Sequence, residues 1–360
     1  MILILLFLLF RGNIWALGHE LQLHSENQIS IQRFPSVSVL YEPHSPIVIH
    51  GNANFSATAA AEEWPGNGIL TNPYVIDSLN ITGSLDSNLI EIRNTTTHFR
   101  ISNCLFNQGK FGICFINVST GYIANNIVTN NTHYGIFLNR SENIIISGNT
   151  ITNNRYYGIP LEFSKNNTLR GNTVINNSYG INFYYSENNT LLDNIIVKNN
   201  EGVVFQRSKN NIIAGNTVTN NIYQGISLYF SDNNTLTSNT IDNNSLLYSH
   251  GIFLNRWSNY NRVQNNSFFG NTADGSQAVD DGSNNAFVYN YWSDWTSPDG
   301  DADGIVDEPY PIGGEAKNHD PYPLVAPTTT MTKLSPGWTF ILLLLSFIAM
   351  LPLRRRKKKT

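Results

Sequence analysis

The densest group of chemically active side chains is an acidic run near the C-terminus. It consists of Asp299, Asp301, Asp303 and, after a glycine, Asp307. Carboxylates at alternate loop positions, with a glycine at the sharp turn, can surround a hard cation with oxygen ligands. The run lacks the glutamate that closes an EF-hand loop, because Tyr310 stands at that position. We therefore expect a structural Ca²⁺ site at the four aspartates, with a solvated acidic turn as the alternative.

The charge of the chain is concentrated around this run. The whole sequence carries 22 basic and 26 acidic residues. Residues 274–320 alone hold 11 acidic residues and one basic residue, a net charge of −10, whereas residues 19–273 are nearly balanced. Such a local excess favours cation binding. The broad basic surface that nucleic acids require is missing, so we expect no nucleic-acid partner.

A second candidate group consists of aromatic residues that recur with a regular spacing, together with one glutamate. Its members are Tyr156, Tyr157, Glu162, Tyr184, Tyr185, Tyr229 and Phe230. Exposed aromatic rings with polar neighbours suit the stacking and hydrogen bonding of sugars, so these residues are a candidate glycan site. The alternative is that the rings only stack on one another and stabilise the fold.

The same surface does not favour catalysis. Glycosidases need a pair of carboxylates, but Glu162 is the only acidic residue among the outward positions that we expect there. Three repeats that are not adjacent carry an arginine just after these positions, namely Arg140, Arg207 and Arg256. We therefore expect a binding site rather than a lyase or hydrolase.

Cysteine and histidine indicate little metal or redox chemistry. Cys104 and Cys114 flank one turn, and both alternate with apolar residues, so we expect both to face outward. They could form an extracellular disulfide or remain two free thiols. Copper sites need clusters of Cys, Met or His, whereas His133 and His250 occupy turn positions of a repeat. We do not expect copper.

An internal repeat organises all of these residues. Asparagine accounts for 52 of the 360 residues, which is typical of a repeated motif. A Gly-apolar step recurs every 22 to 26 residues, at Gly112, Gly135, Gly158, Gly180, Gly202, Gly225 and Gly251. Each period also contains Ser-x-Asn-Asn and Asn-Thr-apolar-x-Asn-Asn steps. Self-similarity of this length indicates a solenoid, a propeller or an array.

The repeat predicts an all-β solenoid. Each period holds three short pieces in which apolar residues alternate, and Asn or Gly stands at the junctions. Three short strands in about 22 residues fit one coil of a parallel β-helix with about nine coils. The strands of successive coils would lie about 4.8 Å apart. Ile136, Ile159, Ile181 and Ile226 should then form one inward file, meaning a row of equivalent residues in successive coils.

Both ends of such a solenoid need a cover. Residues 54–64 have the composition of a helix with a Ser cap, and we interpret them as the N-terminal lid. At the other end we expect aromatic residues to close the core, namely Phe287, Tyr289, Tyr291, Trp292 and Trp295.

The Asn-Asn-Thr-Leu coils resemble the NosD-type right-handed parallel β-helix repeat over about residues 60–325. The family name implies a periplasmic copper-binding protein, and the wider group includes carbohydrate-binding proteins and sugar hydrolases. Residues 64–76 resemble the opening segment of archaeal surface members of this group. Residues 290–304 resemble their closing segment. The resemblance implies a right-handed β-helix but does not specify an activity.

The ends of the chain predict its location. Residues 1–18 are typical of a secretory signal peptide, and residues 337–353 are an uncharged stretch long enough to span a bilayer. A basic block at 354–360 follows, which favours a cytoplasmic tail. Between them we expect an N-terminal region and cap at 19–88, repeats at 89–290, an acidic cap at 291–325 and a stalk at 326–336. A sorting tail that is removed from the mature protein is the alternative to the membrane helix.

The sequence thus predicts a single-pass, membrane-anchored β-helix whose body lies outside the cell. We expect it to bind a cell-surface glycan or protein without catalysis. An extracellular polysaccharide lyase or hydrolase and a copper-handling protein are the alternatives.

Overall fold

The computed structural model describes residues 41–244, 250–271, 276–295 and 298–328, together with the backbone of 19–23 and 29–33. The chain divides into two units, residues 1–42 with 332–360 and residues 43–331. In the first unit, β1 (His19–Leu23) pairs antiparallel with β2 (Ile29–Arg33). The predicted signal peptide, membrane segment, basic tail and most of the stalk lie outside the described residues. Among the residues that are described, no helix is long and apolar enough to cross a membrane.

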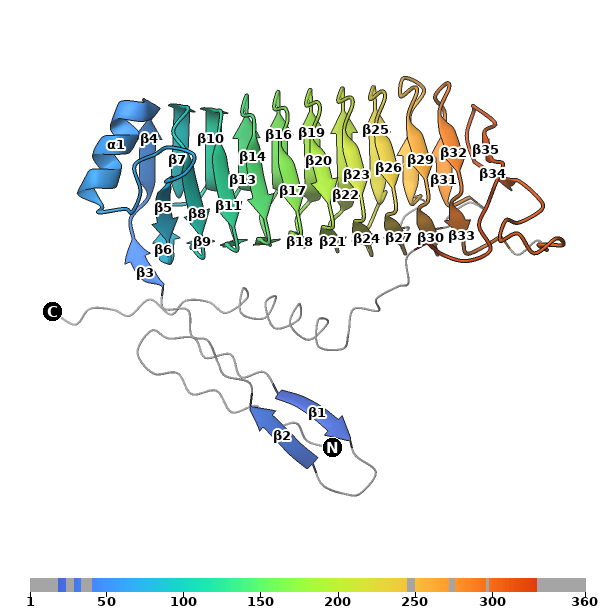
Figure 1. The fold of residues 1–360 in the computed structure, drawn as a ribbon, viewed down its shortest axis with the longest axis horizontal. Coiled ribbons are helices and arrows are strands. Elements are labelled where there is room, and N and C mark those ends of the chain that lie inside the picture. The colour runs from blue at the N-terminus through green and yellow to red at the C-terminus, as the bar shows by residue number, and fades with distance from the viewer. Residues whose placement is uncertain are drawn as a thin grey trace. The chain divides into compact units, whose positions relative to one another are not determined.

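The second unit consists mainly of three parallel sheets (Figure 1). Sheet 1 contains β4 (Ile47–His50), β7 (Ile90–Thr95), β10 (Phe111–Val118), β13 (Tyr134–Asn139), β16 (Tyr157–Glu162), β19 (Tyr179–Tyr184), β22 (Glu201–Gln206), β25 (Ile226–Tyr229), β28 (Ile252–Leu254) and β31 (Ala278–Asp280). Sheet 2 contains β5 (Tyr74–Asp77), β8 (Phe99–Ser102), β11 (Gly121–Ala124), β14 (Ile144–Ser147), β17 (Thr168–Arg170), β20 (Thr190–Leu192), β23 (Ile212–Ala214), β26 (Thr235–Thr237), β29 (Arg262–Gln264) and β32 (Ala286–Val288). Sheet 3 contains β3 (Glu42–His44), β6 (Leu79–Thr82), β9 (Leu105–Asn107), β12 (Ile127–Thr129), β15 (Thr150–Thr152), β18 (Thr173–Ile175), β21 (Ile195–Val197), β24 (Thr217–Thr219), β27 (Thr240–Asp242), β30 (Ser267–Phe269) and β33 (Tyr291–Trp292).

Each coil contributes one strand to each sheet, and equivalent residues of successive coils pair with each other. Ile159 pairs with Ile181, which pairs with Val203, and Val203 pairs with Ile226. These side chains are fully buried in one continuous core that also contains Ile136. The predicted inward file, the three strands per coil and the number of about nine coils are confirmed.

The repeat glycine is explained by lack of space. A Cβ atom added to Gly180 would lie 2.4 Å from the carbonyl oxygen of Gly202 and 3.1 Å from Nδ2 of Asn199. Gly158 and Gly202 meet the same obstruction in their own coils. Any larger residue would push neighbouring coils apart, so this position recurs as glycine.

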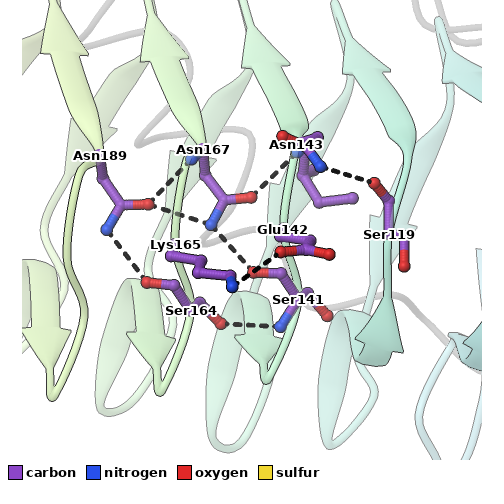
Figure 2. Close-up of polar contacts among 9 residues, drawn as sticks. Ser119, Ser141, Glu142, Asn143, Ser164, Lys165, Asn167 and Asn189 are labelled. Atoms are coloured by element: carbon purple, nitrogen blue, oxygen red, sulfur yellow. Dashed lines mark hydrogen bonds and ion pairs between the residues drawn. The ribbon is translucent and has the colours of Figure 1, made fainter.

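The paired asparagines have two different roles. The first of each pair, such as Asn166 or Asn188, adopts a left-handed backbone at a corner, which asparagine tolerates well. The second is buried and joins a ladder of amides. Asn167, for example, donates both its backbone N–H (2.9 Å) and its Nδ2 (3.0 Å) to Oδ1 of Asn189, as Figure 2 shows.

Hydroxyl groups form a parallel ladder beside the amides. The backbone N–H of Ser141 donates to Oγ of Ser164 at 3.1 Å (Figure 2). Ser164 repeats the contact with Ser186 at 3.1 Å in the next coil. These ladders satisfy backbone groups at the corners, where no sheet partner is available.

All three amide ladders donate toward the C-terminal end, so each needs a final acceptor. One ends on Asp320, whose Oδ2 accepts from Nδ2 of Asn290 at 3.0 Å. Another ends on Asp280, whose Oδ1 accepts from Nδ2 of Asn285 at 2.7 Å. The third ends on Oε1 of Gln277. Part of the acidic C-terminal charge, which the sequence assigned to cation binding, therefore terminates these ladders.

The N-terminal lid is confirmed, with corrected boundaries. The helix α1 spans Gly51–Ala61 and covers the blue end of the sheets in Figure 1. The predicted Ser cap was wrong, because the N-cap residue is His50, and its backbone N–H donates to Oδ1 of Asn54 at 2.8 Å. Phe55 closes the core, with its ring centroid 5.1 Å from that of Phe99.

Aromatic residues close the opposite end, as expected. Trp292 is buried and stacks on Phe268 at 4.2 Å. Tyr310, from the short antiparallel pair β34 (Tyr310–Pro311) and β35 (His319–Asp320), also stacks on Trp292, at 4.1 Å. Tyr289 does not belong to this closure, because its ring is exposed and stacks on Tyr322.

The amide ladders allow a direct test of what holds the coils together. Asn194 is the acceptor for both N–H groups of Asn172, at 2.9 Å each. The substitution Asn194→Ala leaves the buried backbone N–H of Asn172 without a partner and its Nδ2 with only the carbonyl of Ile146, so we expect the free energy of unfolding to fall by about 2–5 kcal/mol. Asn200→Ala, at an exposed position, is the matched control and should change little. Equal stability of the two variants in chemical denaturation would contradict a structural role for the ladder.

Candidate functional site

A shallow pocket lies on the outward face of sheet 1. Its volume is about 370 Å³, and its lining comes from three neighbouring coils, namely Tyr179, Tyr184, Glu201, Val204, Gln206, Arg207, Tyr229 and Phe230. The strands β19, β22 and β25 place these residues side by side, because Tyr179 pairs with Glu201, and Tyr184, Gln206 and Tyr229 follow one another in register. The inward residues of these strands fill the core, which fixes the outward ones.

Glu201 is the half-buried acid of the pocket. Burial raises its pKa above the ordinary value, and a hydrogen bond from Oγ of Ser227 (3.4 Å) partly opposes this effect. Burial, together with the nearby Glu201 carboxylate, also raises the pKa of Tyr179 and of Tyr229. The phenols therefore remain protonated at neutral pH. The pocket combines hydroxyl donors with a carboxyl group that retains its proton more readily than an exposed one, a set suited to hydrogen bonding with sugar hydroxyls.

Arg207 forms the edge of the pocket. Its Nη1 donates to the hydroxyl of Tyr185 at 2.6 Å. The guanidinium carbon lies 5.4 Å from the ring centroid of Tyr185 and 5.2 Å from that of Phe230. Two rings thus hold the cation in place, while the arginine itself remains exposed.

The structure brings together only part of the predicted glycan site. Tyr184, Tyr229 and Phe230 line the pocket, and Tyr185 supports it through Arg207. Tyr157 lies one coil away and stacks on Tyr179 at 4.8 Å.

The other two predicted residues lie outside the pocket. Oε2 of Glu162 accepts from Nδ2 of Asn139 at 3.2 Å, one coil before Tyr184. Tyr156 belongs to the preceding corner, with the guanidinium of Arg155 over its ring at 5.4 Å.

Five lining residues were missing from the predicted set, namely Tyr179, Glu201, Val204, Gln206 and Arg207. Glu201 is the most informative of these. It stands directly before Gly202, at the position that Tyr134, Tyr157 and Tyr179 occupy in earlier coils. The outward positions expected from the sequence all lie after the repeat glycine. The row of residues directly before the glycine, which contains Glu201, was therefore not predicted.

Of the two predicted alternatives, a disulfide or two free thiols, the structure has the second. The predicted outward orientation was wrong for Cys104 but is confirmed for Cys114. Cys104 and Cys114 are free and buried. Cys104 occupies the ladder position that Asn126 has in the next coil and packs in the core, whereas Cys114 lies outside that core, in register with Phe137. The wall of the solenoid therefore separates the two sulfurs. Burial raises the pKa of each thiol to about 12, so neither is a reactive thiolate at neutral pH.

The structure brings together three of the four predicted calcium ligands. Asp299, Asp301 and Asp307 each place a carboxylate oxygen within 4.8 Å of the others. Asp303 is not part of this group, and its Oδ1 accepts from the backbone N–H of Ile305 at 2.8 Å. Three carboxylates fit the oxygen preference of Ca²⁺, and calcium binding stays a prediction.

Comparison with known proteins places this geometry among β-helices. Residues 152–314 match the family described as periplasmic copper-binding protein (NosD), and residues 66–206 match the right-handed β-helix region. No curated protein matches the chain at a significant level.

Two similar solved structures are enzyme modules. The first is the A-module of the mannuronan C-5 epimerase AlgE6 from Azotobacter vinelandii (15% identity, TM-score 0.55, covering 60% of this chain and 67% of that one). The second is the enzymatically active domain of tailspike protein 2 from bacteriophage CBA120 (11% identity, TM-score 0.54, covering 77% of this chain). The matched region spans only 46% of the tailspike domain. At these identities the likeness concerns the fold alone.

The raised pKa of Glu201 predicts a pH dependence of stability. Because its pKa is raised by folding, its contribution to stability is complete below its ordinary pKa and is lost as the pH rises through the raised value. The substitution Glu201→Gln removes this loss. We therefore expect the difference in Tm, variant minus wild type, to increase as the pH rises from about 4 to about 8. Asp242, whose pKa burial also raises, is present in both proteins and cancels. Parallel Tm curves for the two proteins would contradict the assignment.

The aspartate group can be tested with calcium itself. Binding to the folded state alone stabilises it by an amount that grows with the logarithm of the ligand concentration relative to Kd, so added Ca²⁺ should raise Tm and a chelator should reverse the increase. Asp301→Asn should abolish the response. Glu315→Gln, which removes an exposed charge from the same cap, should preserve it. A wild-type Tm that does not respond to Ca²⁺ or chelator would contradict a calcium site at these aspartates.

Proposed function

We propose that this chain, a NosD-like right-handed parallel β-helix protein, is a non-catalytic surface module that binds a polysaccharide on the outward face of sheet 1. The observation that carries the proposal is the pocket on three neighbouring coils. It places three tyrosine rings (Tyr179, Tyr184 and Tyr229) beside hydroxyl, amide and carboxyl groups, with Phe230 at the edge. Sugars are bound by such a mixture of ring surfaces and polar groups.

The regular spacing of the coils also supports an elongated ligand. Equivalent outward residues repeat about every 4.8 Å along the solenoid. A polysaccharide presents its units at a similarly regular interval, so one chain can make related contacts with several coils. The same fold in AlgE6, named as a mannuronan epimerase, agrees with this type of ligand but does not establish it.

An extracellular location completes the proposal. It rests on the sequence of residues 1–18 and 337–360, which are typical of a signal peptide and of a membrane anchor with a basic tail. In that arrangement a cell-surface glycan, or a surface protein, is accessible to the β-helix.

One observation favours a polysaccharide-active enzyme as the second candidate. Glu201 is a half-buried acid whose pKa is raised, and it lies in the same pocket as Arg207. Perturbed acids in a cleft are typical of proton-transfer sites. Copper handling has less support, because among the described residues the only group of potential metal ligands consists of carboxylates, and these prefer hard cations.

One experiment separates binding from turnover. The purified full-length chain is applied to a glycan array, and the best ligand is measured by calorimetry. Tyr229→Ala removes a ring from the pocket, so we expect a loss of affinity of about tenfold. Tyr122→Ala, on sheet 2, is the matched control and should bind as the wild type does.

The same ligand is then incubated with the protein and assayed for new reducing ends and for unsaturated or epimerised sugars. An unchanged ligand supports a binding module, whereas turnover that Glu201→Gln abolishes would establish the enzyme instead. Absence of binding to every glycan, or equal losses in both tyrosine variants, would overturn the proposed site.

A further inference from the structure

The corner that follows sheet 1 contains unusual left-handed residues. In successive coils the position is occupied by Asn94, Asn117, Arg140, Phe163, Tyr185, Arg207 and Phe230, with φ between 47° and 55°. Asparagine and glycine adopt this conformation readily, and they hold most of the equivalent positions at the other corners. Large side chains incur a steric penalty there. Five consecutive coils therefore retain strained residues at a corner that asparagine serves in the two coils before them.

These five residues and Trp257, which stacks on the last of them, form one connected surface. We call it the arginine–aromatic file: Arg140, Phe163, Tyr185, Arg207, Phe230 and Trp257. The rings of Phe163 and Tyr185 stack at 5.3 Å, and those of Phe230 and Trp257 stack at 4.7 Å. Arg207 lies between the two pairs. All four rings are between 39% and 52% exposed, so core packing does not explain them.

The arginines of this edge are not neutralised. Arg140 lies over Phe163 at 5.9 Å, and Arg256 lies over Trp257 at 5.1 Å. None of Arg140, Arg207 and Arg256 is among the ion pairs found in the described part of the chain. Cations that are held by rings and lack a carboxylate partner remain available to an anion.

The stacking geometry shows which part of the file is available to a ligand. Stacked rings cover each other's faces, so they restrict the guanidinium rather than offer a platform for a sugar. A guanidinium fixed in this way presents N–H donors that match the two oxygens of a carboxylate or a sulfate. Its rotational freedom is already reduced before binding, which favours affinity.

We propose that the polysaccharide bound by this protein is acidic, and that Arg207 binds its carboxylate or sulfate groups at the edge of the pocket. The ligand chain runs along the solenoid axis. Arg140 and Arg256, roughly three and two coils from Arg207, bind further acid groups about 14 Å and about 10 Å away. This inference rests on the proposed function and specifies the class of its ligand.

The test compares three polysaccharides with the full-length chain, one carrying uronate groups, one carrying sulfate groups and one neutral. We expect at least one acidic polymer to bind at least tenfold more tightly than the neutral one. Its affinity should fall as salt increases, because the contact is ionic. The uronate and sulfate arms identify the acid group.

Variants that remove the same charge at different places distinguish a specific site from nonspecific attraction of an acidic polymer to the protein. Arg207→Gln should weaken acidic binding about tenfold or more. Arg170→Gln removes an exposed arginine from sheet 2 and should have no effect. Equal losses in the two variants would overturn the site. The variant Arg140→Asn replaces a strained residue with one that suits the left-handed corner, so it should keep or raise Tm while weakening binding.

The outcomes separate the two proposals. Binding of the neutral polymer as tightly as the acidic ones would overturn this inference and leave the proposed function intact. Failure of all three polymers, together with an empty glycan array, would overturn both. Tight acidic binding that Arg207→Gln leaves unchanged, with an unaltered Tm, would place the acid group elsewhere and contradict the role of the file.

Discussion

The buried hydrogen bonds between successive coils are the constraint on which the rest of the structure depends. A solenoid must turn its backbone at every corner, and each turn leaves N–H groups that no sheet partner can accept. Here the side chain of Asn189 accepts from Asn167, and the same contact recurs along the chain with little change in length. Because the contact requires equivalent atoms in successive coils, it fixes their register even where one coil is longer, as between Asn234 and Asn261.

Because of that register, residues one period apart in the sequence lie side by side on the same face. Inward residues are restricted to side chains that fill one core, as Ile181 and Val203 do. Outward residues have no such restriction, so the face of sheet 1 can change from tyrosine to glutamate between Tyr179 and Glu201 without altering the fold. The pocket and the arginine–aromatic file are both products of this freedom. In the file, the chain even accepts unfavourable backbone geometry, which points to selection for something other than stability.

The acidic C-terminal segment illustrates how one composition can serve two structural purposes. Asp320 and Asp280 are buried and receive the last donors of two amide ladders. Asp299, Asp301 and Asp307 instead gather in an outer loop of the same segment. Net charge alone could not separate these roles, because the separation depends on which carboxylates meet the end of a ladder.

The sequence by itself determined the architecture, because the fold repeats a local pattern. The glycine period, the alternation around Ile136 and the Asn-Asn pairs each describe one coil, and stacking identical coils requires no further information. The same reasoning could have placed Cys104, which stands 22 residues before Asn126 in the ladder position. The site was less accessible to this reasoning, since Tyr184, Tyr229 and Phe230 were predicted and five other lining residues were not.

Only the tertiary structure decided the properties that arise between coils. Glu201 is half-buried, which raises its pKa, in a pocket that it shares with Tyr179 from the coil before and Tyr229 from the coil after. Arg207 becomes a fixed cation because rings on both sides enclose it. Asp320 terminates a ladder that begins almost 200 residues earlier in the chain. These effects depend on distances between side chains of different coils, and a linear sequence specifies the order of those residues but not their contacts.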